Sequence, residues 1–276
     1  MKRYLLLKLL IYIIIFVVMP CRAYSIDITA GATTWYAFGS RYEDVKDGCS
    51  RENTNYAFDP TFLYGPALSV KFNNDFNLTF VFLYGKFDYK ENYLETGGIA
   101  DFQHNMKSRA ARSDSDLALN YRLNDYFKAF AGIKYMSYKI DISHDATAFG
   151  GDNLWTHIKH VSVGPGIGLS GTLPIIDNIF ALATISGFYL WSAGEKFNDN
   201  WIYAPRADLT IGYNEYGINS TLSIAYYIAD WSTVISLGGR FQYFIIDYYE
   251  YEPFLINSIT NKIYGITLTA TYSFSI

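Results

Sequence analysis

Cysteine, histidine and charge are all scarce in this chain of 276 residues. It has two cysteines and four histidines, and charged residues make up 17% of it. Cys21 falls in an N-terminal segment that we expect to be removed, and the remaining lone thiol, Cys49, cannot form an internal disulfide. No Cys or His is placed at metal-ligand spacing. We therefore expect no disulfide framework, no metal site and no cofactor.

Long apolar runs are absent after the N-terminal segment. No later stretch reaches the about 18 apolar residues that a membrane-spanning helix needs. Half of the chain is nevertheless hydrophobic, and 26 Tyr and 20 Phe bring the aromatic fraction to 18%. The core of a soluble protein does not need so much tyrosine, whereas strands with lipid on one face and water on the other do.

The N-terminal segment has the parts of a secretory signal peptide. Lys2 and Arg3 give it a positive start, residues 5–18 are apolar apart from one lysine, and small residues three apart end at Ala23. We expect cleavage after Ala23, which leaves residues 24–276 as one barrel domain.

Two alternatives for residues 1–23 are a membrane-anchor helix and lipoprotein processing at Cys21. No later part of the chain is polar in the way a tethered soluble domain would be, and Pro20 directly precedes the cysteine; both observations favour the signal peptide. Its removal takes four of the 22 basic residues and none of the 26 acidic ones, leaving 18 basic and 26 acidic. That balance disfavours a nucleic-acid partner.

The C-terminal segment alternates with the period of a β-strand. Its apolar positions are Tyr264, Ile266, Leu268, Ala270, Tyr272, Phe274 and Ile276. The residues between them are Gly, Thr or Ser, and segment 26–38 alternates in the same way. A sheet in a bilayer cannot leave an unpaired edge, so we expect the last strand to pair with the first and close a ring.

Between these two strands the alternation repeats as four hairpins. Their turns are short and carry Asn or Asp, as tight turns prefer, at 73–76, 124–126, 175–178 and 229–231. The remaining connections are long and polar, at 39–61, 88–111, 141–157, 193–217 and 247–262. This asymmetry is typical of an outer-membrane barrel. We predict an all-β fold, a transmembrane antiparallel β-barrel of ten strands with short periplasmic turns and long extracellular loops.

Segment 204–213 also alternates and could add a strand. A bacterial single-chain barrel is expected to have an even number of strands. We therefore assign this segment to the outer loop at 193–217, with a barrel of twelve strands as the alternative.

The end of the chain resembles the terminal signal that outer-membrane proteins present to their assembly machinery. Phe274 lies two residues before the terminal Ile276, where that signal usually ends on Phe. The resemblance implies the barrel assembly machinery as a partner, and the outer membrane as the location. Outer-membrane lipid and lipopolysaccharide would be the surrounding partners. The sequence leaves the oligomeric state open.

Alternation also turns charges of both signs toward the lumen. The inward residues are Asp114, Asp116, Arg122, Lys134 and Arg240. Opposite charges in a narrow space of low dielectric attract strongly and are costly to leave single. We predict that these five side chains form an ionic network that fills much of a ten-stranded lumen.

Asp114 and Asp116 place two carboxylates on one face, and paired acids can activate a water molecule. A ten-stranded barrel of this length with a lumen-facing Asp-x-Asp resembles the omptins, which are outer-membrane proteases. The resemblance implies an Asp–His couple opposite the acid pair. This chain has no matching Asp-x-His, because His144 and Asp145 are adjacent and point to opposite faces.

His160 and Ser162 share a face in the manner of the His-x-Ser of lipid A deacylases, but the sequence supplies no third, orienting group. We therefore predict no catalytic residue. The expected function is a structural or surface-interaction barrel with a charged, largely filled lumen. The alternatives are a narrow, porin-like channel for small solutes or ions and a hydrolase acting on peptides or lipid A, since fold alone does not choose among them.

Overall fold

The structure is a computed structural model. It describes residues 26–45, 54–95, 102–144, 154–199, 209–248 and 256–276. The expected signal peptide and Cys49 lie outside these residues. Within them, no helix is long and apolar enough to cross a membrane.

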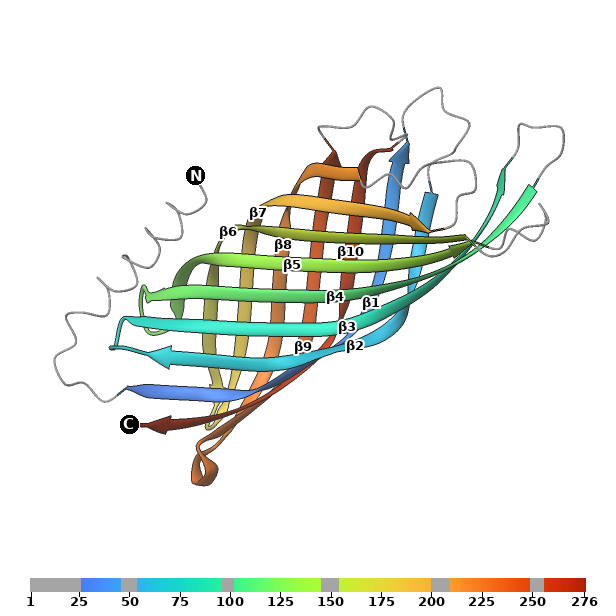
Figure 1. Ribbon diagram of the computed structural model, residues 1–276. Helices are drawn as coiled ribbons and strands as arrows, with labels where there is room; N and C mark the ends of the chain where they lie inside the picture. Colours follow the sequence, from blue (N-terminus) through green and yellow to red (C-terminus); the bar gives the residue numbers. More distant parts are fainter. Residues whose placement is uncertain (1–25, 46–53, 96–101, 145–153, 200–208, 249–255) are drawn as a thin grey trace.

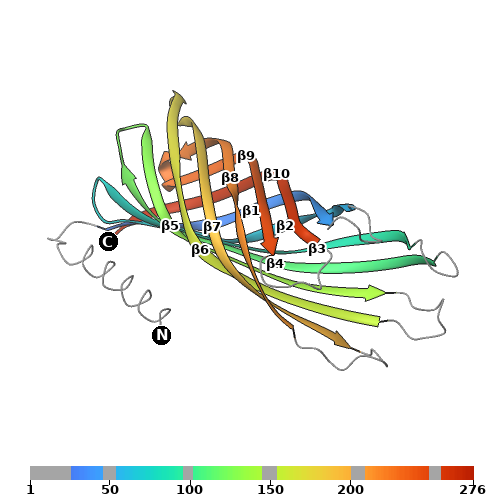
Figure 2. The same ribbon diagram turned by 90° about the horizontal axis from the view of Figure 1, so that it is seen from above.

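Ten antiparallel strands form one closed barrel (Figures 1 and 2), which confirms the predicted fold class. The strands are β1 (Asp27–Val45), β2 (Thr54–Lys71), β3 (Phe76–Glu95), β4 (Phe102–Arg122), β5 (Phe127–His144), β6 (Leu154–Ile176), β7 (Ile179–Asp199), β8 (Leu209–Ile228), β9 (Thr233–Tyr248) and β10 (Ile256–Ser275). Each strand pairs with its neighbours in sequence, and β1 pairs with both β2 and β10. The predicted pairing of the last strand with the first is therefore confirmed.

The short turns, the start of β1 and the end of β10 lie at one end of the barrel, which we call the turn end (Figure 1). The opposite end is the loop end. Asn73 and Asn124 organise two of the turns in the same way. Each side-chain Oδ1 accepts two backbone N–H groups two and three residues later, at 2.8–2.9 Å. Such Asx turns satisfy donors that the strand ends leave free, which is why Asn opens both turns.

The strands are 16–23 residues long, and this corrects the predicted loop boundaries. A tilted strand needs only about 9–11 residues to cross the hydrocarbon, so each strand continues well beyond it. The segments assigned to loops consist largely of these extensions. In particular, β7 runs to Asp199 and β8 begins at Leu209, so part of segment 193–217 is strand and the alternation at 204–213 extends into β8. Beyond the belt the outward residues become polar, as Asp88 and Asp141 do, so an apolar outer face no longer marks these parts as strand.

Two rings of outward aromatic side chains bound the apolar belt of the barrel. The turn-end girdle includes Tyr121, Tyr126, Phe127, Trp231 and Tyr272, and the loop-end girdle includes Phe62, Tyr64, Tyr135, Tyr189, Trp191 and Tyr264; all are exposed on the outer face. Tyr264 and Tyr272 are eight residues apart on β10, which is about 20 Å along the axis for a strand tilted by about 40°. That spacing suits the about 25 Å apolar band of an outer-membrane barrel.

The strands are strongly staggered. Following the pairings once around the barrel from Asp27 on β1 leads back to β1 at Gly39, twelve residues further along. A stagger of this size goes with the steep tilt of the strands in Figure 1. It also decides which inward side chains share a level in the lumen, because neighbouring strands contribute residues from different heights.

The hydrophobic core of this protein lies inside the barrel. Its buried members include Trp35, Leu63, Leu83, Phe87, Met136, Phe188, Leu190, Phe244, Ile259 and Ile263. They come from β1, β2, β3, β5, β7, β9 and β10 and meet in the lumen. Nearer the turn end, Gly168 makes room for Phe130, whose ring would lie 2.4 Å from a Cβ added at the glycine. Side chains, rather than an open water column, occupy much of the interior.

Candidate functional site: the closed lumen

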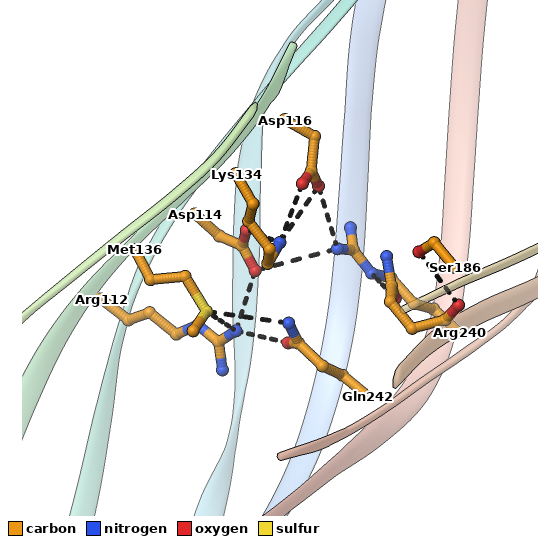
Figure 3. Close-up of polar contacts among 9 residues, drawn as sticks. Arg112, Asp114, Asp116, Lys134, Met136, Ser186, Arg240 and Gln242 are labelled. Atoms are coloured by element: carbon orange, nitrogen blue, oxygen red, sulfur yellow. Dashed lines mark hydrogen bonds and ion pairs between the residues drawn. The ribbon is translucent and has the colours of Figure 1, made fainter. Parts of the chain in front are cut away.

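Four of the five residues predicted to form a lumen network lie together inside the barrel (Figure 3). Lys134 Nζ on β5 donates to Asp114 Oδ1 at 2.5 Å and to Asp116 Oδ1 at 3.0 Å, both on β4. Arg240 reaches across from β9, with Nη2 at 3.8 Å from a carboxylate oxygen of each aspartate. The contacts therefore join strands on opposite sides of the barrel.

Arg122 is the exception. It lies at the turn end, where its exposed guanidinium pairs with Asp125 three residues later. Its inward parity was predicted from the alternation. Arg122 follows Asp114 by eight residues on the same strand, β4, which places it about 20 Å nearer the turn end and out of reach of the network.

Arg112 takes the place in the network that we had assigned to Arg122. Its guanidinium is fully buried and donates to Asp114 Oδ2 at 2.8 Å. It also donates to the amide oxygen of Gln242 on β9 and lies 3.7 Å from the sulfur of Met136. Asp114 thus faces three cations, Lys134, Arg112 and Arg240. The buried Gln242 holds Arg112 in place by accepting its hydrogen bond.

Aromatic rings enclose these cations. The Arg240 guanidinium lies 4.7 Å from the ring centre of Trp35, and Lys134 Nζ lies 5.5 Å from that of Phe188. Arg112 lies 5.7 Å from the centre of Phe244. Such cation–π contacts are strongest where water is excluded. We call the ionic residues and these rings together the plug.

A second polar cluster lies beside the plug and centres on Glu215 of β8. The Glu215 carboxylate is fully buried; its Oε1 contacts His160 Nε2 at 2.8 Å and accepts from Ser162 Oγ at 2.7 Å. Ser192 donates to Ser162 at 2.8 Å. Glu215 was missed from the sequence because its strand was assigned to the loop at 193–217. It supplies the orienting acid that the His-x-Ser pattern lacked.

The geometry of this cluster differs from that of a catalytic triad. In a triad the histidine lies between the acid and the nucleophile. Here the carboxylate lies between His160 and Ser162, so the imidazole is not in position to take the serine proton.

The described parts of the chain contain no group of three His, Cys, Asp or Glu residues suited to a metal ion.

The turn end of the lumen is polar and open. A cavity of about 460 Å³ opens there, lined by residues that include Asp27, Lys71, Asn77 and Lys128. Thr29 and Ser273, whose hydroxyls are 2.9 Å apart, also line this cavity, and Thr33 and Thr269, four residues further into the barrel on the same two strands, form a second hydroxyl pair at 2.7 Å. The interior therefore has a polar vestibule at the turn end and the plug beyond it.

An apolar belt between two aromatic girdles, around a closed antiparallel ring of ten strands, defines a β-barrel of the outer-membrane type. The outer membrane protease OmpT of Escherichia coli has a similar structure: TM-score 0.60, 12% identity, 92% of this chain and 99% of that chain covered. The translocator domain of the autotransporter NalP from Neisseria meningitidis gives a TM-score of 0.44 at 9% identity, covering 91% of this chain and 89% of that chain. At 12% identity, the likeness to OmpT shows the fold alone. No family model and no curated protein matches the sequence.

Proposed function

We propose that this protein is an integral protein of the bacterial outer membrane with a structural or surface-interaction role and a closed lumen. The observation that carries the proposal is the plug, in which Asp114, Lys134 and Arg240 join β4, β5 and β9 across the interior. Buried ion pairs of this kind resist opening, because separating them leaves charges unpaired in a low dielectric.

The long strands support the surface role. Beyond the loop-end girdle, β5 continues for nine residues from Tyr135 to His144, and its neighbours extend similarly. The outward residues there are charged and exposed, as Asp88, Arg109 and Asp141 illustrate. In the proposed orientation the turns face the periplasm, and these extensions carry the hairpins out past the headgroups of the outer leaflet.

Two other functions each have one supporting observation. The polar vestibule favours a channel, whose gate would be the plug. The contacts among His160, Ser162 and Glu215 favour a hydrolase, although the carboxylate lies between the other two side chains and all three are buried. We rank both below the closed barrel for these reasons.

Purified protein in liposomes tests all three functions. We expect no swelling with small sugars and no cleavage of peptides or lipid A. Hydrolysis that is lost in Glu215→Gln or Asp116→Asn, but kept in the turn variant Asp125→Asn, would overturn the proposal in favour of an enzyme. Solute uptake by the unmodified protein would overturn it in favour of a channel.

A further inference from the structure

Strands β2 and β3 separate at the loop end of the barrel. They pair from the turn end as far as Tyr64 and Tyr84, and beyond that pair the register gives β3 no partner on this side among the described residues. The other side of β3 stays paired with β4 as far as Glu95. Figures 1 and 2 show β2 and β3 turning away from each other there. We call the unpaired side of residues 85–95 the β3 edge.

A bulge in β2 accounts for the separation. While β1 advances by two residues from Ala37 to Gly39, the register on β2 moves by three, from Thr61 to Phe58. The interval contains Pro60. A bulge bends its strand and increases the local twist, and a proline has no N–H to donate to a neighbour. Bulges and prolines are devices that protect a strand edge from further pairing, so β2 is the protected side of the separation.

The β3 edge has neither device. The register of β3 with β4 is continuous over the whole strand, and the sequence of β3 contains no proline. A regular, unpaired edge presents N–H and C=O groups that can pair with another extended chain. On the lumen side, the ring centre of Phe58 lies 5.6 Å from that of Phe87 and 5.4 Å from that of Tyr89. These rings bridge the separation from inside, so the backbone of β3 is left without a partner while its inward side chains are packed.

The outward side of the β3 edge carries a lysine without an ion pair. Lys86 is exposed between the buried Gly85 and Phe87, and no carboxylate in the described parts of the chain is within ion-pair distance of it. The next outward residue, Asp88, already accepts from Arg109 at 2.7 Å. A strand added to this edge would place one of its residues directly opposite Lys86. Opposite charges in that position stabilise a sheet, so the edge favours an acidic residue there.

We propose that the β3 edge binds an extended peptide segment of a partner protein outside the cell, and that this segment adds to the sheet as a further strand. Main-chain hydrogen bonds along the edge would give affinity, and alternate side chains would give specificity. The outward residues of the segment would include an acid opposite Lys86. Its inward residues would be small or apolar, because they face the rings of Phe87 and Tyr89. The inference rests on the proposed surface role and names the class of partner.

Three short fluorescent peptides are the probes. The first alternates Val and Glu, the second alternates Val and Lys, and the third is the Val–Glu peptide with a methyl group on every backbone nitrogen, which removes the N–H donors that strand pairing needs. Binding to the full mature chain, folded in a zwitterionic detergent, is measured by fluorescence anisotropy. Gel mobility before and after heating confirms that each protein variant is folded.

The matched protein variants are Lys86→Glu and Lys262→Glu. Lys262 is also exposed and lies two residues from Tyr264 of the loop-end girdle, but its strand is paired on both sides, with Ser40 and with Tyr243. The two variants therefore make the same change of charge at an open edge and at a closed position.

We expect the unmodified protein to bind the Val–Glu peptide and not its methylated form. Lys86→Glu should weaken binding of the Val–Glu peptide about fivefold and should make the Val–Lys peptide the preferred one, whereas Lys262→Glu should change neither. Equal binding of the methylated peptide, equal losses in the two variants, or no binding of any probe overturns the proposal. Self-association of the unmodified protein that Lys86→Glu abolishes would make a second copy of the chain the occupant, and would also overturn it.

Labelling of a cysteine at Asp141 in whole cells separates this inference from the proposed function. If the label reaches Asp141 but none of the peptides binds, only the strand-addition site is wrong. If the label does not reach Asp141, the proposed orientation and a partner outside the cell are both wrong.

Discussion

Asp114→Asn is the substitution that most directly probes the plug. The side chain of Asp114 is 1% exposed and faces Lys134 at 2.5 Å, Arg112 at 2.8 Å and Arg240 at 3.8 Å. The amide keeps the size and removes the charge. Lys134 and Arg240 would then keep only Asp116, whose side chain is 36% exposed, and Arg112 would lose its ion pair with Asp114. Breaking a buried ion pair by removing one partner costs about 3–5 kcal/mol.

The control is Asp125→Asn at the turn end, where the lost partner of Arg122 is 77% exposed. Exposed pairs contribute about 0–1 kcal/mol. The free energy of unfolding can be measured by equilibrium urea titration in lipid vesicles, with the folded fraction read from gel mobility. Adding Lys134→Gln to Asp114→Asn should cost less than the sum of the two single changes, since the two groups interact. The reasoning is refuted if Asp114→Asn costs no more than Asp125→Asn.

Three further predictions concern the fold. The purified protein should show a β-rich circular dichroism spectrum and a heat-dependent gel mobility, and should fold only with lipid or detergent; a helical spectrum would contradict the barrel. Asn73→Ala should lower the free energy of unfolding by about 1 kcal/mol by leaving two turn donors unpaired, whereas Asn74→Ala, which removes no such bond, should have little effect. In a Cys49→Ser background, a cysteine at Asp141 should react with a membrane-impermeant label in whole cells, and one at Asp125 should not; the reverse result would invert the orientation.

The ten strands could be predicted because lipid imposes a strict pattern. Each crossing strand must alternate, and each ring must close, so the two-faced ends of the chain already implied their pairing. The turns could be predicted because Asn73 and Asn124 are chemically suited to them. The strand lengths could not be predicted, since the requirement for an apolar outer face ends with the belt. Segment 204–213 does alternate, but the even number of strands led us to assign it to a loop, whereas it extends into β8.

The residues of the plug could also be predicted only in part. Alternation assigns a side chain to the lumen but does not give its height. Arg122 was grouped with the aspartates although it lies eight residues from Asp114 on the same strand, a distance that the sequence already gives. The heights of Lys134 and Arg240, which lie on other strands, come from the stagger, which depends on all ten pairings together. Arg112 shares the parity of Asp114, which made it a possible partner of the two aspartates, although it was not included in the predicted network. Glu215 required the boundary of β8, which only the structure gives.

The central claim is that the lumen is closed, and conductance across planar bilayers tests it most directly. The unmodified protein should give no steady channel current when the electrolyte is about 1 M salt. The variant Phe188→Ala with Phe244→Ala and Met136→Ala removes two rings of the plug and the methionine that contacts Arg112. It should produce discrete openings if gel mobility shows that it folds. A large, steady conductance from the unmodified protein would contradict the account and make the protein a channel.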